Sequence, residues 1–389
     1  MHRSSRKRKR TLSFLLLLLT GGLIAAGCGA PPVPTALPAT PTPPPPTPVP
    51  EGMLSPDDLD AFDFVIERKI EAVPLAGVAL GIDWGDNEAY VQGYGYANLA
   101  TVEPVSGDTV FQIASLTKQF TAAAIMQLVD RGEVALDDPV GRFYPDAPAS
   151  WQGVTVHHLL SHTSGIPDVA DLVPADLSGD LTNPTTPQEL VAALHDAPLS
   201  FEPGTKFRYG SSGYRLLAGI VAEVTGMPAE AYYREHLFEP LGLDSTLPCY
   251  TDYERIAQGY SIVAGQLEPV IAHDPVQGVG PSGLCSSAAD LLVWQQALVS
   301  GEVVSPESYR KMTTPIKLEG GEILAYGYGL GVAPDAVAHG GSLPGFRSWL
   351  AYYPDEDLTI VLLSNTDIPA AYSLDILGDV IAGRILGKD

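Results

Sequence analysis

The stretch Phe111-Gln112-Ile113-Ala114-Ser115-Leu116-Thr117-Lys118 leads into an apolar run over residues 120–129. This run predicts a helix that begins near Ser115 and ends near Arg131-Gly132. Residues three apart lie on one face of a helix, so Lys118 can approach the Ser115 hydroxyl, remove its proton and hold the developing anion. Free backbone N–H groups at a helix start add to that stabilisation. The pattern predicts a nucleophilic serine, but four residues alone leave a solvated helix start as the alternative.

The first 28 residues have the features of a bacterial export signal. Residues 3–10 hold six basic side chains, residues 12–19 are apolar, and residues 21–28 are small. The apolar part is too short for a membrane span. The ending Ile24-Ala25-Ala26-Gly27-Cys28 resembles a lipobox, which implies that residues 1–27 are a signal peptide and that Cys28 carries a lipid. Cleavage near Ala30 without lipidation is the alternative.

Residues 28–54 predict a stalk between this lipidated cysteine and a folded domain. Eleven prolines fall within residues 31–50, which indicates polyproline-II structure of roughly 60 Å at about 3.1 Å per residue. A helix start at 55–58 opens a globular domain over residues 55–389. We therefore expect a secreted protein of the cell envelope, anchored to the bacterial membrane by lipid and facing away from the cytoplasm.

The composition narrows the choice of partners. The chain has 389 residues, 45% of them hydrophobic, and a formal net charge of −24. Such an acidic protein repels nucleic acid, so no nucleic-acid partner is expected. Cys249 and Cys285 remain besides Cys28, and outside the cytoplasm they could pair, although their spacing does not decide it.

Strand patterns occur at both ends of the domain and helical patterns lie between them. The expected strands are 76–83, 89–97, 326–332, 337–339, 346–353 and 358–364. The expected helices are 59–70, 154–161, 187–197, 214–225, 228–237, 288–299 and 370–386. This order predicts an α+β fold, in which N- and C-terminal helices flank one antiparallel sheet and a mainly helical insertion covers about 133–290.

Three further segments contain residues suited to chemistry. Tyr209-Gly210-Ser211 lies on a loop just before a helix. His339-Gly340-Gly341-Ser342 lies on an expected strand, where the glycines allow a ligand to approach the backbone. The third segment is His157-His158-Leu159-Leu160-Ser161-His162-Thr163-Ser164-Gly165.

In their order and spacing, these motifs resemble those of the serine β-lactamase and penicillin-binding-protein superfamily, in particular its class C, D-Ala-D-Ala carboxypeptidase and esterase branch. The resemblance covers about 59–386 and includes Ser-x-x-Lys, a Tyr-x-Asn-like motif about 90 residues later and His-x-Gly near the C-terminus. It implies a β-lactamase/transpeptidase-like fold and a serine hydrolase that forms an acyl-enzyme.

The resemblance also implies a role for each residue. Ser115 would be the nucleophile, Lys118 would polarise it, and Tyr209 would be the partner base that carries the proton to the leaving group. The backbone N–H groups of Ser115 and Ser342 would form the oxyanion hole. The substrate would contact four residues: Ser211, His339, Gly340 and Gly341. His339 would also hydrogen-bond or orient Tyr209.

Two departures from the family pattern bear on the substrate. Ser211 stands where the family has asparagine, which weakens recognition of an amide side chain. His339 stands where many members have lysine, which weakens recognition of a carboxylate. A small-molecule ester is therefore favoured over a D-Ala-D-Ala-like peptide, and both over a β-lactam. The alternative function is a non-catalytic envelope binding module that keeps the fold.

No metal or other cofactor is expected. His158 and His162 have the spacing of a metal pair, but no glutamate follows His158, and His157 offers no useful third ligand. The chain also lacks the Gly-x-Ser-x-Gly elbow of α/β-hydrolases.

Overall fold

The structure is a computed structural model that describes residues 61–66, 68, 73–85, 89–168, 186–270, 280–369 and 373–387. All of them belong to one compact unit, Pro43–Asp389. The expected signal peptide, Cys28, the stalk and the helix start at 55–58 lie outside the described residues. No helix among the described residues is both long and apolar enough to cross a bilayer.

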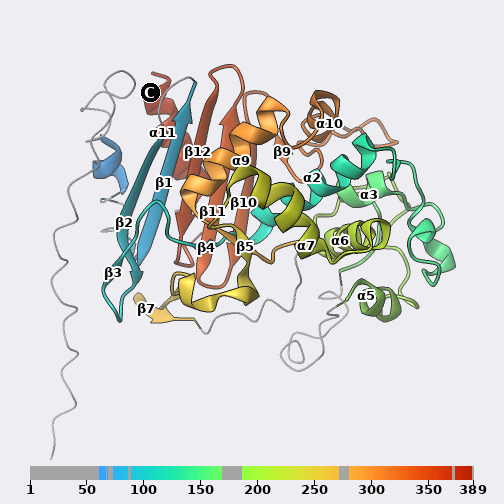
Figure 1. Cartoon of the computed structure of the whole chain (residues 1–389), viewed down its shortest axis with the longest axis horizontal. Coiled ribbons are helices and arrows are strands. Elements are labelled where there is room, and N and C mark those ends of the chain that lie inside the picture. The colour runs from blue at the N-terminus through green and yellow to red at the C-terminus, as the bar shows by residue number, and fades with distance from the viewer. Residues whose placement is uncertain are drawn as a thin grey trace, which may run out of the picture. The chain divides into compact units, whose positions relative to one another are not determined.

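A seven-stranded sheet of order β3-β2-β1-β12-β11-β10-β9 forms the centre of the fold (Figure 1). Every neighbouring pair is antiparallel. The strands are β1 Gly77–Trp84, β2 Tyr90–Asn98, β3 Glu103–Pro104, β9 Gly331–Val332, β10 Val337–Leu343, β11 Phe346–Tyr353 and β12 Leu358–Ser364. Since β1 pairs directly with β12, strands from both ends of the domain share one sheet. The predicted α+β fold is confirmed.

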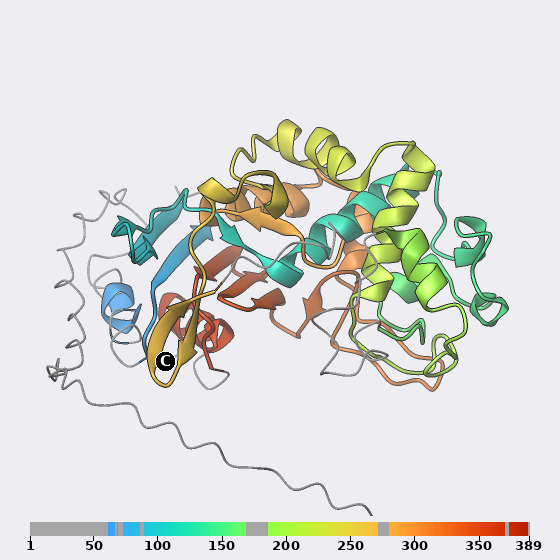
Figure 2. The ribbon, with the colours of Figure 1, turned by 90° about the horizontal axis from the view of Figure 1, so that it is seen from below.

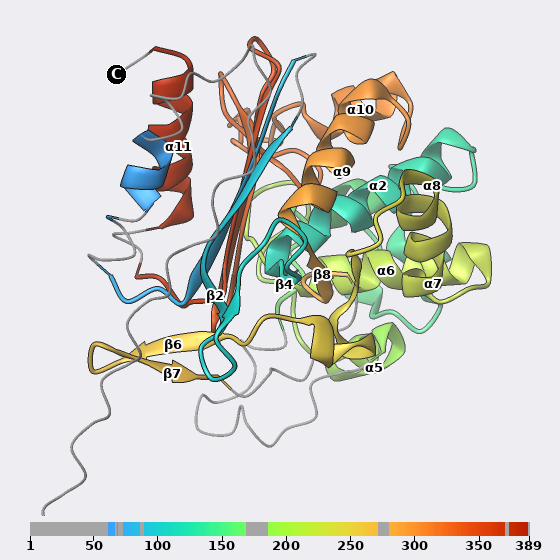
Figure 3. The same ribbon diagram turned by 60° about the vertical axis from the view of Figure 1, so that its left-hand side comes forward.

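Helices cover both faces of the sheet (Figure 3). Strand β12 is buried along its whole length, so its alternate side chains enter two separate cores. Ile360 and Leu362 pack with α11 (Leu374–Ile385) and with the helix at residues 61–66, whereas Val361 and Leu363 face the core that contains α9 (Ala288–Ser300).

The helical part of the fold lies beyond α9, beside the sheet (Figure 2). Its central helix, α2 (Thr117–Asp130), precedes the expected insertion at about 133–290. This helix is buried on nearly every side, and Phe120 stacks on Trp294 with ring centroids 4.0 Å apart. The other helical elements are η1 Ala114–Leu116, η2 Val140–Arg142, η3 Ala149–Trp151, α3 Val156–Leu160, α5 Pro187–Ala193, α6 Ser212–Thr225, α7 Ala229–Tyr233, the π-helical turn η4 Arg234–Phe238, α8 Glu239–Leu241, η5 Cys249–Thr251, η6 Tyr253–Arg255 and α10 Pro306–Met312.

Two small β structures outside the main sheet were not predicted. A three-stranded sheet joins β4 (Phe111–Gln112), β8 (Leu284–Ser286) and β5 (Leu247–Pro248), and a hairpin joins β6 (Tyr260–Val263) to β7 (Gln266–Pro269). Cys249 and Cys285 form a disulfide at the β5–β8 pair. The bond links β8 to the residue that follows β5, and β8 also pairs with β4, the strand that leads into Ser115.

The predicted strand over 326–332 is wrong in most of its length. Only Gly331–Val332 is a strand, because Gly329 has a φ of +72° and the Gly327 N–H donates to Leu330 O, which folds the chain back on itself. Strand β10 instead runs past its predicted end at His339, to Leu343.

The disulfide should contribute measurably to stability. Replacing Cys249 and Cys285 together by alanine should lower the free energy of unfolding by about 2–4 kcal/mol, because the bond closes a loop of sequence separation 36 in the unfolded chain. Urea unfolding of the double variant and of the wild type measures the difference. Wild type unfolded with a reductant present should match the variant, and equal stability of oxidised wild type and variant would contradict the prediction.

Candidate active site

Ser115 lies in the short turn η1, immediately before α2 rather than inside it. Backbone hydrogen bonds hold this turn: the Ile113 N–H donates to Leu284 O (3.1 Å), and the Leu284 N–H donates to Thr117 Oγ1 (3.2 Å). Ala114 has a φ of +50°, a conformation that is costly for a residue with a Cβ. The surrounding contacts therefore hold Ser115 on a strained bend.

Lys118 is almost completely buried beside this serine, with 1% of its surface exposed. Its Nζ lies 3.2 Å from Ser115 Oγ and donates to Pro281 O at 2.9 Å. Burial lowers the pKa of Lys118 to about 7, because an ammonium ion loses its hydration there. A large fraction of the side chain is thus a neutral amine near neutral pH, in a position to accept the serine proton.

Tyr209 lies on the other side of Ser115. Lys118 Nζ lies 4.7 Å from the centre of its ring, and the neighbouring Ser115 hydroxyl acts to lower the pKa of its phenol. Although 43% of the residue is exposed, the pKa of the Tyr209 phenol is raised to about 12, chiefly because the surrounding protein removes water from the hydroxyl. The phenol therefore keeps its proton at neutral pH, and Lys118 rather than Tyr209 is the base of the resting site.

His162 supports Tyr209, a role that the sequence did not reveal. Its ring lies 4.5 Å from the Tyr209 ring, and its Nδ1 accepts the Gly210 N–H at 3.4 Å. Its Nε2 is buried without a hydrogen-bond partner, and its pKa is lowered well below the usual range by burial. His158 Nδ1 instead accepts the Thr155 N–H at the start of α3. The two histidines thus serve different neighbours.

His339 contacts a different tyrosine from the predicted one. Its Nδ1 donates to Gly340 O (2.7 Å), and its Nε2 accepts from the Tyr326 hydroxyl (3.2 Å), whereas its ring centre lies 6.0 Å from that of Tyr209. The expected hydrogen bond to Tyr209 is therefore replaced by one to Tyr326, which the sequence had placed in a strand. Burial lowers the pKa of His339 to about 4, so this imidazole is neutral at neutral pH.

Strand β10 packs against η1 at Gly341, next to the expected second oxyanion donor, Ser342. Ser348 Oγ donates to Ile113 O (2.7 Å), and a Cβ placed on Gly341 would collide with both of these atoms and lie 3.0 Å from Ala114 Cβ. Only glycine therefore lets β10 approach η1. Ser342 follows Gly341 directly. Strand β9 pairs with β10 only at Val337 and Ala338, so Ser342 lies outside that pairing.

Asp168 is a residue near the site that the sequence did not single out. Its carboxylate accepts the backbone N–H groups of Ser211 (2.7 Å) and Ser212 (3.0 Å), together with the Ser212 hydroxyl (2.9 Å). Ser211, expected to contact substrate, is thus held through its own backbone. A capping carboxylate normally lies just before its helix, but this one precedes α6 by more than forty residues, so the local sequence gave no signal.

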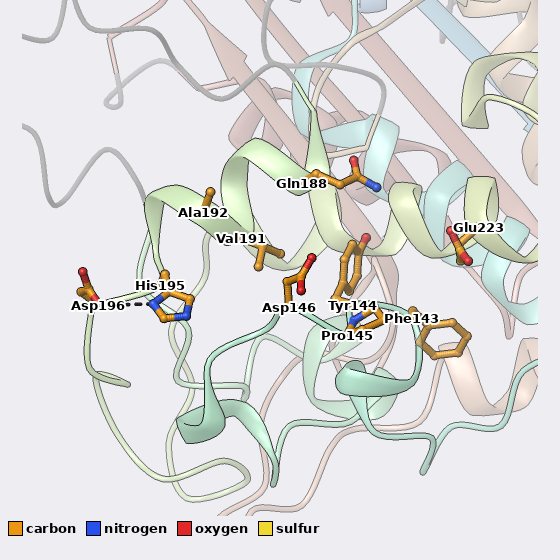
Figure 4. A pocket seen from close by; sticks show the side chains of 10 residues that line it. All are labelled: Phe143, Tyr144, Pro145, Asp146, Gln188, Val191, Ala192, His195, Asp196 and Glu223. Atoms are coloured by element: carbon orange, nitrogen blue, oxygen red, sulfur yellow. Dashed lines mark hydrogen bonds and ion pairs between the residues drawn. The ribbon is translucent and has the colours of Figure 1, made fainter.

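The described residues include no group of three His, Cys, Asp or Glu side chains that could hold a metal ion. A hollow of about 510 Å³ lies elsewhere, between Phe143, Tyr144, α5 and Glu223 of α6 (Figure 4). None of the predicted site residues lines it.

Comparisons with known proteins show the family to which the chain is similar. A family model described as Beta-lactamase matches residues 63–379. Penicillin-binding protein 4* of Bacillus subtilis (strain 168) is 32% identical over 324 residues, which are 77% of this chain and 70% of that protein. Esterase EstB of Burkholderia gladioli is 32% identical over 243 residues, 57% of this chain and 59% of that esterase. The crystal structure of D-amino acid amidase from Ochrobactrum anthropi SV3 superposes with a TM-score of 0.73 at 27% identity, covering 85% of this chain and 98% of that one.

Two glycine-to-alanine variants test the approach of β10 to η1. Gly341→Ala should lower kcat/KM for an activated ester by about 100-fold, because the methyl group would push β10 away from η1 and misplace Ser342. Gly141→Ala, in η2, is the control: a Cβ there meets nothing within 4 Å, so this variant should behave as wild type. Equal activity of the two variants, with equal melting temperatures, would contradict the proposed placement of β10.

Proposed function

Because the chain belongs to the β-lactamase family of serine hydrolases, we propose that it cleaves an ester or amide through an acyl-enzyme formed on Ser115. The observation that carries this proposal is the nearly complete burial of Lys118 with Nζ 3.2 Å from Ser115 Oγ. Burying a lysine without a function is costly, and this lysine lies where it can activate the serine.

The first half of the reaction uses the protonation states of the resting site. Ser115 Oγ attacks the carbonyl carbon, and its proton passes to the neutral Lys118 amine. The backbone N–H groups of Ser115 and Ser342 hold the oxyanion, each donor contributing about 3–4 kcal/mol. The leaving group takes a proton from the Tyr209 phenol, which Lys118 then reprotonates. Water hydrolyses the remaining ester bond to Ser115 and restores the site.

The surroundings favour an uncharged substrate. His339 is neutral at neutral pH, so it supplies no cation for a carboxylate. Phe207, 38% exposed, lies beside His162 and Tyr326 and offers an apolar wall to the acyl or alcohol group. We therefore rank a neutral ester first, a D-stereospecific peptide or amide second, and a β-lactam third.

The rival function, a binding module without turnover, finds little support in the site. Such a module would need neither a lysine with a pKa near 7 nor a strained bend at Ala114. The replacement of the family asparagine by Ser211 narrows substrate recognition but removes none of the groups used in the reaction above.

Acylation can be observed directly. After brief incubation with neutral p-nitrophenyl esters, D-Ala-D-Ala peptides or β-lactams, mass spectrometry of the intact protein should show an adduct that maps to Ser115, and neutral esters should give the highest kcat/KM. Ser115→Ala should form no adduct and lose at least about 1,000-fold in turnover. Lys311→Ala, an exposed lysine of α10, is the control and should behave as wild type. If wild type and Ser115→Ala release product equally slowly and neither is labelled, the binding module is the better description.

We further propose that the chain is exported and held at the membrane through Cys28, as a signal peptide followed by a proline-rich stalk implies. The disulfide between Cys249 and Cys285 supports an oxidising compartment.

The anchor is tested by Cys28→Ser in the full-length chain. Wild type expressed in bacteria should incorporate a fatty-acid label and sediment with membranes, while the variant should incorporate none. A labelled Cys28→Ser protein, or an unlabelled wild type that is cleaved near Ala30, would contradict lipidation.

A further inference from the structure

The loop that carries Tyr209 rests on a carboxylate from a distant part of the chain. Helix α6 has Ser211 at its N-cap, but no side chain of its own caps it. Asp168 fills that role with three accepted hydrogen bonds from Ser211 and Ser212. Gly210 has no room for a side chain, because a Cβ placed on it would collide with Asp168 Oδ2. The backbone from Gly210 to Ser212 therefore lies on this carboxylate, and Tyr209 is the residue just before it.

The same carboxylate acts on Lys118 through its charge. The rings of Tyr209 and Tyr214 lie 4.7 Å and 5.6 Å from Lys118 Nζ, and both phenols are protonated at neutral pH. His162 and His339 also face the lysine, but burial keeps both imidazoles neutral. Asp168 is the negative charge that acts on Lys118 among the described residues, and Arg215 of α6 lies close enough to Asp168 to oppose it.

The two effects on Lys118 have opposite signs. Burial lowers its pKa, while the charge of Asp168 stabilises the ammonium form and raises it, so that the pKa stays at about 7. A general base works best when its pKa is near the working pH. Without the carboxylate, the amine would be deprotonated over a wider pH range but would be a weaker base.

We propose that Asp168 is a positioning residue of the Ser115 site: its hydrogen bonds fix the Tyr209 loop at the start of α6, and they place its carboxylate next to the loop that lies against Lys118. This inference rests on the proposed acylation of Ser115. It extends the part played by the segment after α3, which already supplies His162, because Asp168 belongs to neither α2, α6 nor β10.

The test is the pH profile of kcat/KM for a neutral p-nitrophenyl ester, whose acid limb reports the free enzyme's base. Wild type should have an acid-limb midpoint near pH 7, as the pKa of Lys118 implies. Asp168→Asn should move this midpoint about 0.5–1 pH unit lower, because the ammonium loses a stabilising charge. The plateau of kcat/KM should fall about tenfold. The amide N–H₂ group of asparagine cannot accept a hydrogen bond from the backbone N–H of Ser211 or Ser212, so the Tyr209 loop loses a contact.

Two variants separate charge from structure. Ser212→Ala removes one hydrogen bond to Asp168 but keeps the charge, so its plateau should fall a few-fold with the midpoint unmoved. Arg215→Gln removes the opposing cation and should move the midpoint to higher pH. Circular dichroism and thermal melting show whether Asp168→Asn folds. If it does not, Arg215→Gln alone tests the effect of charge on the midpoint.

The outcomes are distinct from failure of the proposed function. If wild type forms the Ser115 adduct, but Asp168→Asn and Arg215→Gln both keep the wild-type midpoint, Asp168 is only a helix cap and the inference is wrong. If wild type forms no adduct at Ser115, the proposed function itself fails. Midpoints that move in opposite directions in the two variants, with Ser212→Ala unchanged, support the role of the Asp168 charge.

Discussion

The burial of one amine beside one hydroxyl is the constraint on which the site depends. An ammonium ion removed from water is unstable unless it is paired, so the protein interior shifts Lys118 toward its neutral form, with a pKa of about 7. Helix α2 makes this burial unavoidable, because it is enclosed on nearly every side. The apolar run that predicts the helix is thus also the reason why Lys118, in its first turn, is buried and can act as a base.

The groups around Lys118 come from segments that only the tertiary fold brings together. Pro281 O, which accepts a hydrogen bond from Lys118, belongs to the segment that leads into β8. The disulfide joins β8 to Cys249, the residue after β5. Tyr209 is held by the cap of α6, and Ser342 by the glycine contact between β10 and η1. The site therefore lies where the insertion meets the sheet, and its geometry is as rigid as that junction.

The sequence predicted the regular parts well and the irregular parts poorly. The strands at 346–353 and 358–364 have the predicted bounds because half of the first run is aromatic and the second consists mainly of leucine and β-branched residues. The strand at 326–332 failed because Gly329 turns the chain. Strands of two or three residues, such as β4 and β5, are too short to show a period. Spacing within a motif placed Lys118 correctly next to Ser115, but the partners of His339 and the cap by Asp168 depend on contacts between distant segments, which no local pattern encodes.

The electrostatics of the site and of the whole chain point to the same class of substrate. Two buried imidazoles that could have carried positive charge are neutral, and Asp168 brings a negative charge close to the only buried lysine of the described residues. The chain as a whole has a formal net charge of −24, which disfavours the approach of anions. A carboxylate-bearing substrate would thus meet repulsion both on approach and on binding. A neutral ester meets neither, and its charge develops only at the oxyanion, where backbone N–H groups are held in place before the reaction begins.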